Sequence, residues 1–260
     1  MAASHTDSHP ARTELASISL DDLIVAIRAG GVDAQLVEGR TAAGGVDARL
    51  AASGTTEQAA VRGMTVDSRE VQPGNLFVCK GAAFRPAFLA SAIERGACAY
   101  LCPNDAALLD QLELVAPGAP HIVASDVRRA MALVAPVVYQ HPEQALDIVG
   151  ITGTKGKSTV AYMLRSILLA AGETPSVLGS IETDDGIEHY ESHNTTPEAP
   201  ELWRHLWNSV KSGRRHMVME VSSQGLKYDR VLGVPLSLGV FLNIGRDHIS
   251  GVEHPTREDY

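Results

Sequence analysis

The run GTKGKST at residues 153–159 has the residue types of a phosphate-binding loop. The usual pattern, G-x-x-x-x-G-K-S/T, would place a glycine at position 151, where this chain has Ile151. The run is therefore either a chance cluster of glycines or a shorter variant, Gly-x-x-Gly-Lys-Ser-Thr. In such a loop Lys157 would neutralise the charge of nucleotide phosphates, and the Ser158 hydroxyl would reach Mg²⁺.

The residues on either side of the run favour the phosphate-loop interpretation. The apolar, β-branched stretch over 148–152 is typical of a buried parallel strand. Behind the run, apolar residues recur at helical spacing over 160–168, and Gly172 can end that helix. A strand, a tight turn and a helix N-terminus direct backbone N–H groups towards one point, which suits a polyphosphate. The alternative is a lysine-bearing turn without a ligand.

Polar residues also follow two other predicted strands. Glu220 closes an otherwise apolar strand, where a carboxylate is costly unless it is paired or binds a metal. A capping or salt-bridged glutamate is the alternative. Asp247 and His248 follow the strand predicted over 236–244, and an Asp-His pair also occurs in surface turns. Because ligands of open α/β sheets bind at the carboxyl ends of strands, we expect the loop, Glu220 and the segment after Asn243 to meet.

A second group of polar residues lies partly ahead of a predicted helix and partly just past Glu220. The Thr196-Pro197 pair predicts the start of a helix, with the threonine as N-cap, and Gly213 can end it. The polar residues ahead of this helix either cap it or bind an anionic substrate. The group predicts a second, anionic ligand facing the Mg²⁺-nucleotide site, and it consists of Asn194, Thr195, Thr196, Ser222, Ser223 and Arg230.

The alternation of short apolar strands with amphipathic helices predicts an α/β fold. Residues 1–17 read as a disordered lead, 18–145 as an N-terminal α/β domain, and 146–260 as a parallel-sheet domain that carries the loop. The Ala- and Gly-rich stretch 30–58, with near-duplicates at 30–36 and 44–50, reads as a surface excursion. Strands are predicted over 61–69, 75–81, 98–102, 121–125, 148–152, 175–181, 216–221 and 236–244, and helices over 18–28, 88–95 and 127–140.

Composition narrows the class of protein. The 260 residues are 45% hydrophobic and 20% charged, which is typical of a globular protein. A net charge of −9 argues against a nucleic-acid partner or an anionic membrane, although it allows a nucleotide ligand in a local basic site. The sequence shows neither an apolar stretch of membrane-spanning length nor a signal peptide. Three cysteines without metal-ligand spacing read as buried thiols, which makes the cytoplasm the expected location.

Several of these motifs together resemble the Mur ligases, and within that family the tripeptide synthetases. The resemblance runs from about residue 18 to residue 260. It rests on the motifs TVDSR at 65–69, GTKGKST at 153–159, NTTPE at 194–198, MEVSSQ at 219–224 and the segment 243–248. The segments GVFLNIGRDHI and EHPTREDY are most similar in sequence to the branch of enzymes that adds L-lysine rather than diaminopimelate.

The resemblance implies a role for each matching residue. The UDP end of the substrate would contact the first domain, and the muramoyl dipeptide and ATP would contact the second. The catalytic residues would be Lys157, Glu220 and His248, and the metal ligands would be Ser158, Glu220 and His248. ATP would be bound by Gly153, Thr154, Lys155, Gly156, Lys157, Ser158, Thr159 and Asn243. The substrate would be bound by Val66, Ser68, Lys80, Gly81, Asn194, Thr195, Thr196, Ser222 and Arg230.

The implied activity is ATP-dependent amide formation in peptidoglycan precursor synthesis. With ATP and Mg²⁺, an amino acid (L-lysine by the wording) would be joined to UDP-MurNAc-L-Ala-D-Glu through an acyl phosphate, by a monomeric enzyme. The family's carbamylated lysine is expected shortly after the REDY motif, and its third domain is absent from these residues. We therefore interpret the chain as a fragment or a truncated homologue that is inactive by itself.

Two other interpretations remain open at the level of sequence. One is a non-catalytic or vestigial homologue that binds UDP-sugar and nucleotide. The other is a ligase similar to folylpolyglutamate synthase, which shares the nucleotide domain. The Asp-Ser-Arg motif of the first domain argues against the second of these. The residues present do not fix which amino acid is added.

Overall fold

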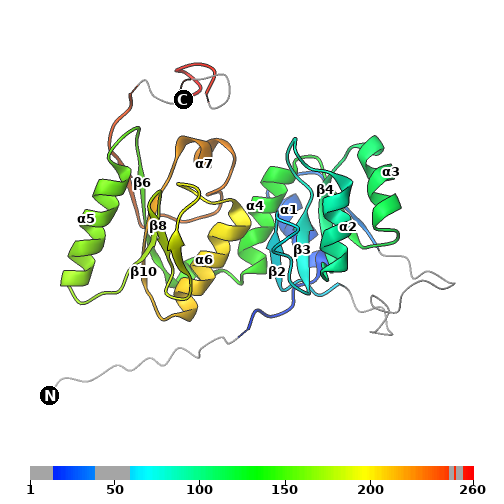
Figure 1. Cartoon of the computed structure of the whole chain (residues 1–260), viewed down its shortest axis with the longest axis horizontal. Coiled ribbons are helices and arrows are strands. Elements are labelled where there is room, and N and C mark those ends of the chain that lie inside the picture. The colour runs from blue at the N-terminus through cyan, green and yellow to red at the C-terminus, as the bar shows by residue number, and fades with distance from the viewer. Residues whose placement is uncertain (1–13, 39–58, 246–248, 250–253) are drawn as a thin grey trace.

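The computed structural model describes residues 14–38, 59–245, 249 and 254–260, which form two β-sheets flanked by helices (Figure 1). Most of the predicted disordered lead and the second copy of the near-duplicate lie outside the described residues. Two residues in the described part of the lead, 14–17, contact the rest of the chain. Leu15 packs against the hydrophobic core, and the Ser17 hydroxyl accepts a 2.9 Å hydrogen bond from Arg62 Nε.

The first sheet has the strand order β1-β5-β4-β3-β2. Strands β2 to β5 pair in parallel, and β1 pairs with β5 in the antiparallel direction. The carboxyl ends of β2 to β5 therefore lie at one edge of this sheet. The strands are β1 Ala34–Val37, β2 Gly63–Thr65, β3 Asn75–Val78, β4 Ala99–Pro103 and β5 His121–Ala124.

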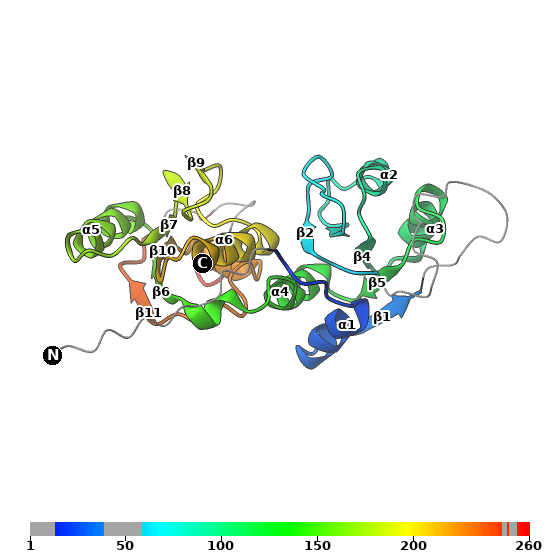
Figure 2. The same cartoon turned by 90° about the horizontal axis from the view of Figure 1, so that it is seen from below.

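Alternating side chains of the central strands supply two separate cores. Leu76 and Leu101 face one cluster, whereas their neighbours Phe77 and Tyr100 face the other, because successive side chains of a strand point to opposite faces. Figure 2 shows the helices that cover these faces in two layers. They are α1 Leu20–Ala29 with α4 Val127–Val138 on one face, and α2 Pro86–Glu94 with α3 Ala106–Val115 on the other.

The second sheet has the order β11-β6-β10-β7-β8-β9, and its first four strands are parallel. Strands β8 and β9 form an antiparallel hairpin at its edge. The strands are β6 Asp147–Thr152, β7 Ser176–Leu178, β8 Glu182–Asp184, β9 His189–Glu191, β10 His216–Glu220 and β11 Leu238–Phe241, and the helices are η1 Pro142–Ala145, α5 Lys157–Ala170, α6 Ala199–Lys211 and α7 Ser223–Lys227.

Helix α6 joins the two sheets by packing against α4. Its fully buried Trp203 belongs to the same hydrophobic cluster as Met131 of α4 and Leu76 of β3. The strands change from one sheet to the other between β5 and β6, and η1 lies directly before β6. Among the described residues, none of the helices is long and apolar enough to cross a membrane.

The structure corrects several sequence predictions. The stretch 30–58 is not all a surface excursion, because β1 lies within it. Helix α6 begins at Ala199 with Glu198 as N-cap, so the prediction that Thr196 is the cap was wrong. Helix α5 is present, but Met163 on its predicted apolar face is 60% exposed. Helix α3, the β8–β9 hairpin and α7 were not predicted.

Candidate functional site

The glycine run forms the predicted turn between a strand and a helix. Strand β6 ends at Thr152, and α5 begins at Lys157 with Gly156 as its N-cap. Gly153 and Gly156 have φ angles of 143° and 89°, which favour glycine. The Lys157 ammonium donates a 2.7 Å hydrogen bond to the carbonyl oxygen of Gly153. The lysine thus lies over its own loop, at a helix N-terminus suited to phosphate.

The segment after β11 holds the glycine loop in place. The Asn243 side-chain amide accepts from the backbone N–H of Lys155 at 3.1 Å and donates to the Lys155 carbonyl at 3.0 Å. The Asn243 carbonyl also accepts from the Thr154 N–H at 3.1 Å. The Thr154 hydroxyl in turn accepts from Gly245 N–H at 2.7 Å and contacts the Tyr260 hydroxyl at 2.6 Å. Asn243 therefore lies at the loop as predicted, where it supports the backbone.

We predict that Gly153→Ala destabilises the chain and weakens nucleotide binding. A Cβ at Gly153 would lie 3.0 Å from Leu242 Cβ and 3.1 Å from both the backbone N and O of Asn243. The matched control is Gly172→Ala, because Gly172 also has a positive φ but no atom within 4 Å of a Cβ. Backbone strain costs about 1–3 kcal/mol at either position. Urea unfolding should show the larger loss for Gly153→Ala, and equal losses would contradict the prediction.

Glu220 lies beside the start of the glycine loop. It pairs in register with Ile151 of β6, and the Val221 N–H donates to the Ile151 carbonyl at 2.8 Å. The Glu220 side chain is buried, with 1% of the residue exposed, and among the described residues it makes no ion pair. Ser180 supplies hydrogen bonds to its carboxylate oxygens. Hence neither the salt-bridge nor the helix-cap alternative describes it, because Ser222 caps α7.

The donor set at this point fits a divalent cation. A buried carboxylate without a cationic partner is costly, and its oxygens have about four lone-pair sites, of which Ser180 uses two. Hydroxyl and carboxylate oxygens are the ligands that Mg²⁺ prefers. Ser158, in the first turn of α5, would add a hydroxyl, because α5 packs against β10. His248, the other predicted ligand, lies outside the described residues.

Two of the predicted substrate-binding residues, Lys80 and Arg230, meet at Glu198. Lys80 of the first sheet and Arg230 both form ion pairs with the Glu198 carboxylate, at 2.8 and 3.1 Å. Arg230 also donates to the Thr196 carbonyl at 2.9 Å. Burial lowers the pKa of Lys80, and the Glu198 carboxylate only partly opposes this. These contacts bring residues from both sheets to one place.

The hydroxyls of Thr196 and Ser222 are used inside the fold. Thr196 is fully buried, donates to the Glu220 carbonyl at 3.0 Å and accepts from the Ser222 N–H at 2.9 Å. The Ser222 hydroxyl accepts from Gly225 N–H at 3.0 Å. In contrast, Thr195 contacts only the Ser180 hydroxyl among the described hydrogen bonds, at 2.8 Å. Asn194 is exposed.

The first sheet carries a pocket of about 300 Å³ at the carboxyl ends of β3, β4 and β5. Lys80 and Gly81 line it, as expected of UDP-binding residues, whereas Val66 and Ser68 are not among its lining residues. Three other polar residues that line the pocket were not predicted from the sequence. Their signal was a strand followed by a capped helix start, and they are Ser125, Asp126 and Arg128.

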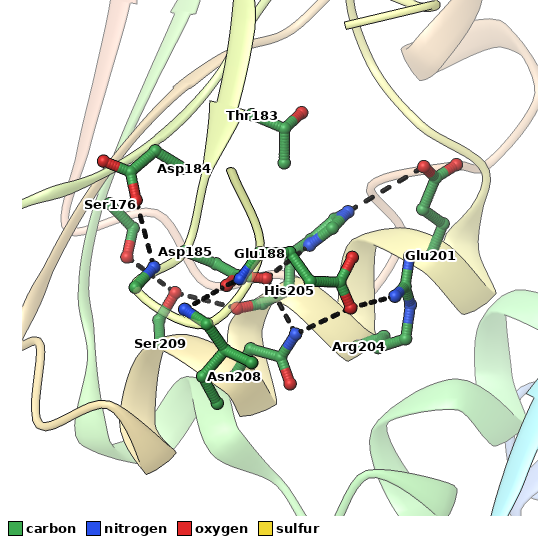
Figure 3. Close-up of polar contacts among 12 residues, drawn as sticks. Ser176, Thr183, Asp184, Asp185, Glu188, Glu201, Arg204, His205, Asn208 and Ser209 are labelled. Carbon is green, nitrogen blue, oxygen red and sulfur yellow. Dashed lines mark hydrogen bonds and ion pairs between the residues drawn. The ribbon is translucent and has the colours of Figure 1, made fainter. Parts of the chain in front are cut away.

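A buried polar cluster, also missed from the sequence, lies between the β8–β9 hairpin and α6 (Figure 3). Ligand atoms of Asp185, Glu188 and His205 lie within 4.8 Å of one another. The Asp185 carboxylate already accepts from His205 Nδ1 at 2.6 Å, from Asn208 Nδ2 at 2.8 Å and from two backbone N–H groups. Arg204 pairs with Glu188. The cluster therefore ties the hairpin to α6.

Comparison with known proteins identifies the family to which this chain belongs. Residues 151–260, which contain the loop, Glu220 and Asn243, match the Mur ligase middle domain. The chain belongs to the Mur ligase family.

The similar proteins with curated names are more specific. A UDP-N-acetylmuramoyl-L-alanyl-D-glutamate--L-lysine ligase of Streptococcus thermophilus is 41% identical over 198 residues, covering 76% of this chain and 39% of that enzyme. A UDP-N-acetylmuramyl-tripeptide synthetase of Lactobacillus delbrueckii subsp. bulgaricus is 42% identical over 210 residues, covering 79% and 39%. This chain thus spans about two fifths of the length of the relatives it matches, 39% in both cases.

Solved structures agree on the fold. A UDP-N-acetylmuramoyl-L-alanyl-D-glutamate--2,6-diaminopimelate ligase has a TM-score of 0.59 at 24% identity, covering 77% of this chain and 39% of that one. MurF from Acinetobacter baumannii has a TM-score of 0.58 at 18% identity, covering 95% and 45%. At these identities the likeness concerns the α/β architecture alone.

Proposed function

We propose that this chain forms the UDP-sugar-binding and central nucleotide-binding parts of an ATP-dependent amide ligase of peptidoglycan precursor synthesis. The observation that best supports this proposal is that the glycine loop, the buried Glu220 and the Asn243 segment meet at the carboxyl ends of adjacent parallel strands. The substrates would be ATP, UDP-MurNAc-L-Ala-D-Glu and a free amino acid. The name of the Streptococcus relative supports L-lysine.

The reaction would join a carboxylate to an amine in two displacements. The substrate carboxylate attacks the γ-phosphorus of ATP and ADP leaves. The amine of the amino acid then attacks the acyl phosphate and phosphate leaves. Mg²⁺, when bound by Ser158 and Glu220, would neutralise phosphate charge. Lys157 would hold the transferring phosphoryl group, since cations carry most of the catalytic load where negative reactants meet.

The group around Glu198 supports a site for the sugar-peptide substrate between the sheets. Lys80 lies in the first sheet's pocket and, through Glu198, contacts Arg230 of the second unit. An elongated anionic substrate could therefore have its UDP end at Lys80 and Gly81 and its peptide end near Thr195 and Arg230. The proposed protein is a monomer that acts in the cytoplasm, where these substrates are soluble.

Titration calorimetry with UDP-MurNAc-L-Ala-D-Glu tests the substrate assignment. Lys80→Ala should weaken binding of this ligand by about tenfold or more, because hydrogen bonds to charged groups contribute about 1.5–3 kcal/mol. ADP with Mg²⁺ should bind as it does to the unchanged chain. The matched control is Lys211→Ala, whose ammonium lies over the Trp207 ring. Equal affinity in the Lys80 and Lys211 variants would remove Lys80 from the site.

A non-catalytic homologue is distinguished by the ligation reaction itself. ATP-dependent incorporation of labelled L-lysine should be measured in this chain and in a longer form that spans the length of the relatives. Incorporation by the longer form supports the ligase. Tight binding of both substrates without incorporation in that form would support a binding protein instead.

A further inference from the structure

Ser180, at the connection between β7 and β8, contacts both oxygens of the Glu220 carboxylate. Its backbone N–H donates to Glu220 Oε1 at 2.9 Å, and its hydroxyl donates to Glu220 Oε2 at 3.2 Å. Two contacts from one residue fix the plane of the carboxylate as well as its position. Ser180 lies forty residues from Glu220 and belongs to none of the motifs described above.

The preceding residue makes this approach possible. A Cβ at Gly179 would lie 2.4 Å from Glu220 Oε1, so the backbone can approach the carboxylate only with glycine there. The Gly179 N–H donates to the Glu182 carbonyl at 3.2 Å. The Glu182 carboxylate then accepts from Tyr162 and Arg165 of α5 at 2.8 and 3.1 Å. The connection that carries Ser180 is thus attached to the helix that begins at Lys157.

The number of hydroxyl protons determines whether Thr195 donates or accepts in its hydrogen bond with Ser180. A serine hydroxyl has one proton. Because Ser180 donates that proton to Glu220, the 2.8 Å contact between the Ser180 and Thr195 hydroxyls uses the proton of Thr195. Thr195 therefore offers only lone pairs to a ligand. It can accept from an N–H or O–H group or contact a cation, whereas a bare carboxylate or phosphate oxygen would meet no donor there.

We propose that Ser180 is a positioning residue of the metal site, which orients the Glu220 carboxylate and makes the Thr195 hydroxyl an acceptor. The inference rests on the proposed function, since it assigns Glu220 to Mg²⁺. It also narrows the part of the substrate that Thr195 meets to a hydroxyl or an amide N–H. The hydrogen bonds run from the Thr195 hydroxyl to Ser180 and from Ser180 to Glu220. Thr195 therefore acts on the carboxylate only through Ser180.

The test is the Mg²⁺ concentration needed for ATP binding, measured by calorimetry at fixed nucleotide. Ser180→Ala should raise that concentration by about tenfold, since a hydrogen bond to a charged group is lost. Ser180→Thr keeps the hydroxyl and should restore the original value. Binding of ATP without Mg²⁺ should be equal in all three proteins. The control, Ser166→Ala, removes a hydroxyl whose one hydrogen bond among the described residues is to the Tyr162 carbonyl of the same helix.

A double variant tests the direction of these hydrogen bonds. Thr195→Val alone should raise the Mg²⁺ requirement by a smaller factor, and added to Ser180→Ala it should change nothing further. Additive effects would overturn the polarity assignment. An unchanged Mg²⁺ requirement in Ser180→Ala, or an equal rise in Ser180→Thr, would overturn the positioning role. If the unchanged protein binds ATP independently of Mg²⁺, it is instead the proposed metal site that fails.

Discussion

Lys157→Ala is expected to lower the affinity of the chain for ATP with Mg²⁺ by about 10- to 100-fold, because hydrogen bonds to charged groups contribute about 1.5–3 kcal/mol. The ammonium lies over the loop, 2.7 Å from the Gly153 carbonyl, at the N-terminus of α5. Without it, the backbone N–H groups and the helix dipole remain as the local attraction for phosphate. Calorimetric titration of both proteins with ATP and Mg²⁺ measures the difference.

Two further variants make this result specific. Lys211→Ala removes a lysine from the end of α6 and should leave the affinity unchanged. Lys157→Arg keeps the charge but replaces a compact ammonium by a planar fork, and should recover only part of the affinity. In a longer form with ligase activity, Lys157→Ala should lower turnover by about 10²-fold or more, since it removes a charge aligned with the transferring phosphoryl group. A Lys157→Ala protein that binds and turns over normally would contradict the nucleotide-loop assignment.

Local signals explain why part of the site was predictable from the sequence. The strand, glycine turn and helix around Lys157 are encoded within 25 consecutive residues, by β-branching, glycine and helical periodicity. Glu220 stood out because one carboxylate ended an apolar strand. The convergence of these residues followed from the general rule for parallel sheets, and the strand register confirms their neighbourhood.

Long-range contacts explain what was missed. Thr196 read as a helix cap, yet its hydroxyl bonds to Glu220 and Ser222 across the sheet edge, a competition that local sequence does not show. Likewise, nothing near Ser180 indicates that a residue forty positions later will lie against it. His205 lies on the face of α6 that also buries Leu202 and Leu206, and its partner Asp185 comes from a distant turn that local sequence does not indicate.

Asp185→Asn is expected to cost about 3–5 kcal/mol of the free energy of unfolding, the usual penalty for removing one partner of a buried ion pair. His205 and Asp185 are both fully buried, 2.6 Å apart. The other ring nitrogen of His205 lies 3.0 Å from the Tyr190 hydroxyl and 3.8 Å from the Glu201 carboxylate. Asparagine keeps the shape of the side chain but removes the charge that compensates the imidazolium.

The loss of unfolding free energy in Asp185→Asn should depend on pH, and the pKa shifts in the cluster set the direction of that dependence. Burial lowers the pKa of His205, but the hydrogen bonds to Asp185 and Glu201 outweigh burial and raise it above the ordinary value. Burial raises the pKa of the Asp185 and Glu201 carboxyls, and their hydrogen bonds outweigh it and lower both. Glu188 and Arg204 complete the charged surroundings of the cluster (Figure 3).

The imidazolium contribution to stability is therefore complete below about pH 6.5, the unfolded pKa of histidine, and is lost as pH rises through the higher folded pKa. The carboxylate contribution is complete above about pH 4 and is lost as pH falls through the lower folded values. The difference in unfolding free energy between the unchanged protein and Asp185→Asn should thus be largest between these limits and shrink on both sides. Urea unfolding across this range measures the difference in unfolding free energy, and NMR titration of the His205 imidazole measures its pKa.

The control is Asp105→Asn, because Asp105 is an exposed N-cap of α3 and asparagine caps equally well. A cost below about 1 kcal/mol, the range of exposed pairs, together with an unshifted His205 titration, would show that the cluster does not hold an ion pair.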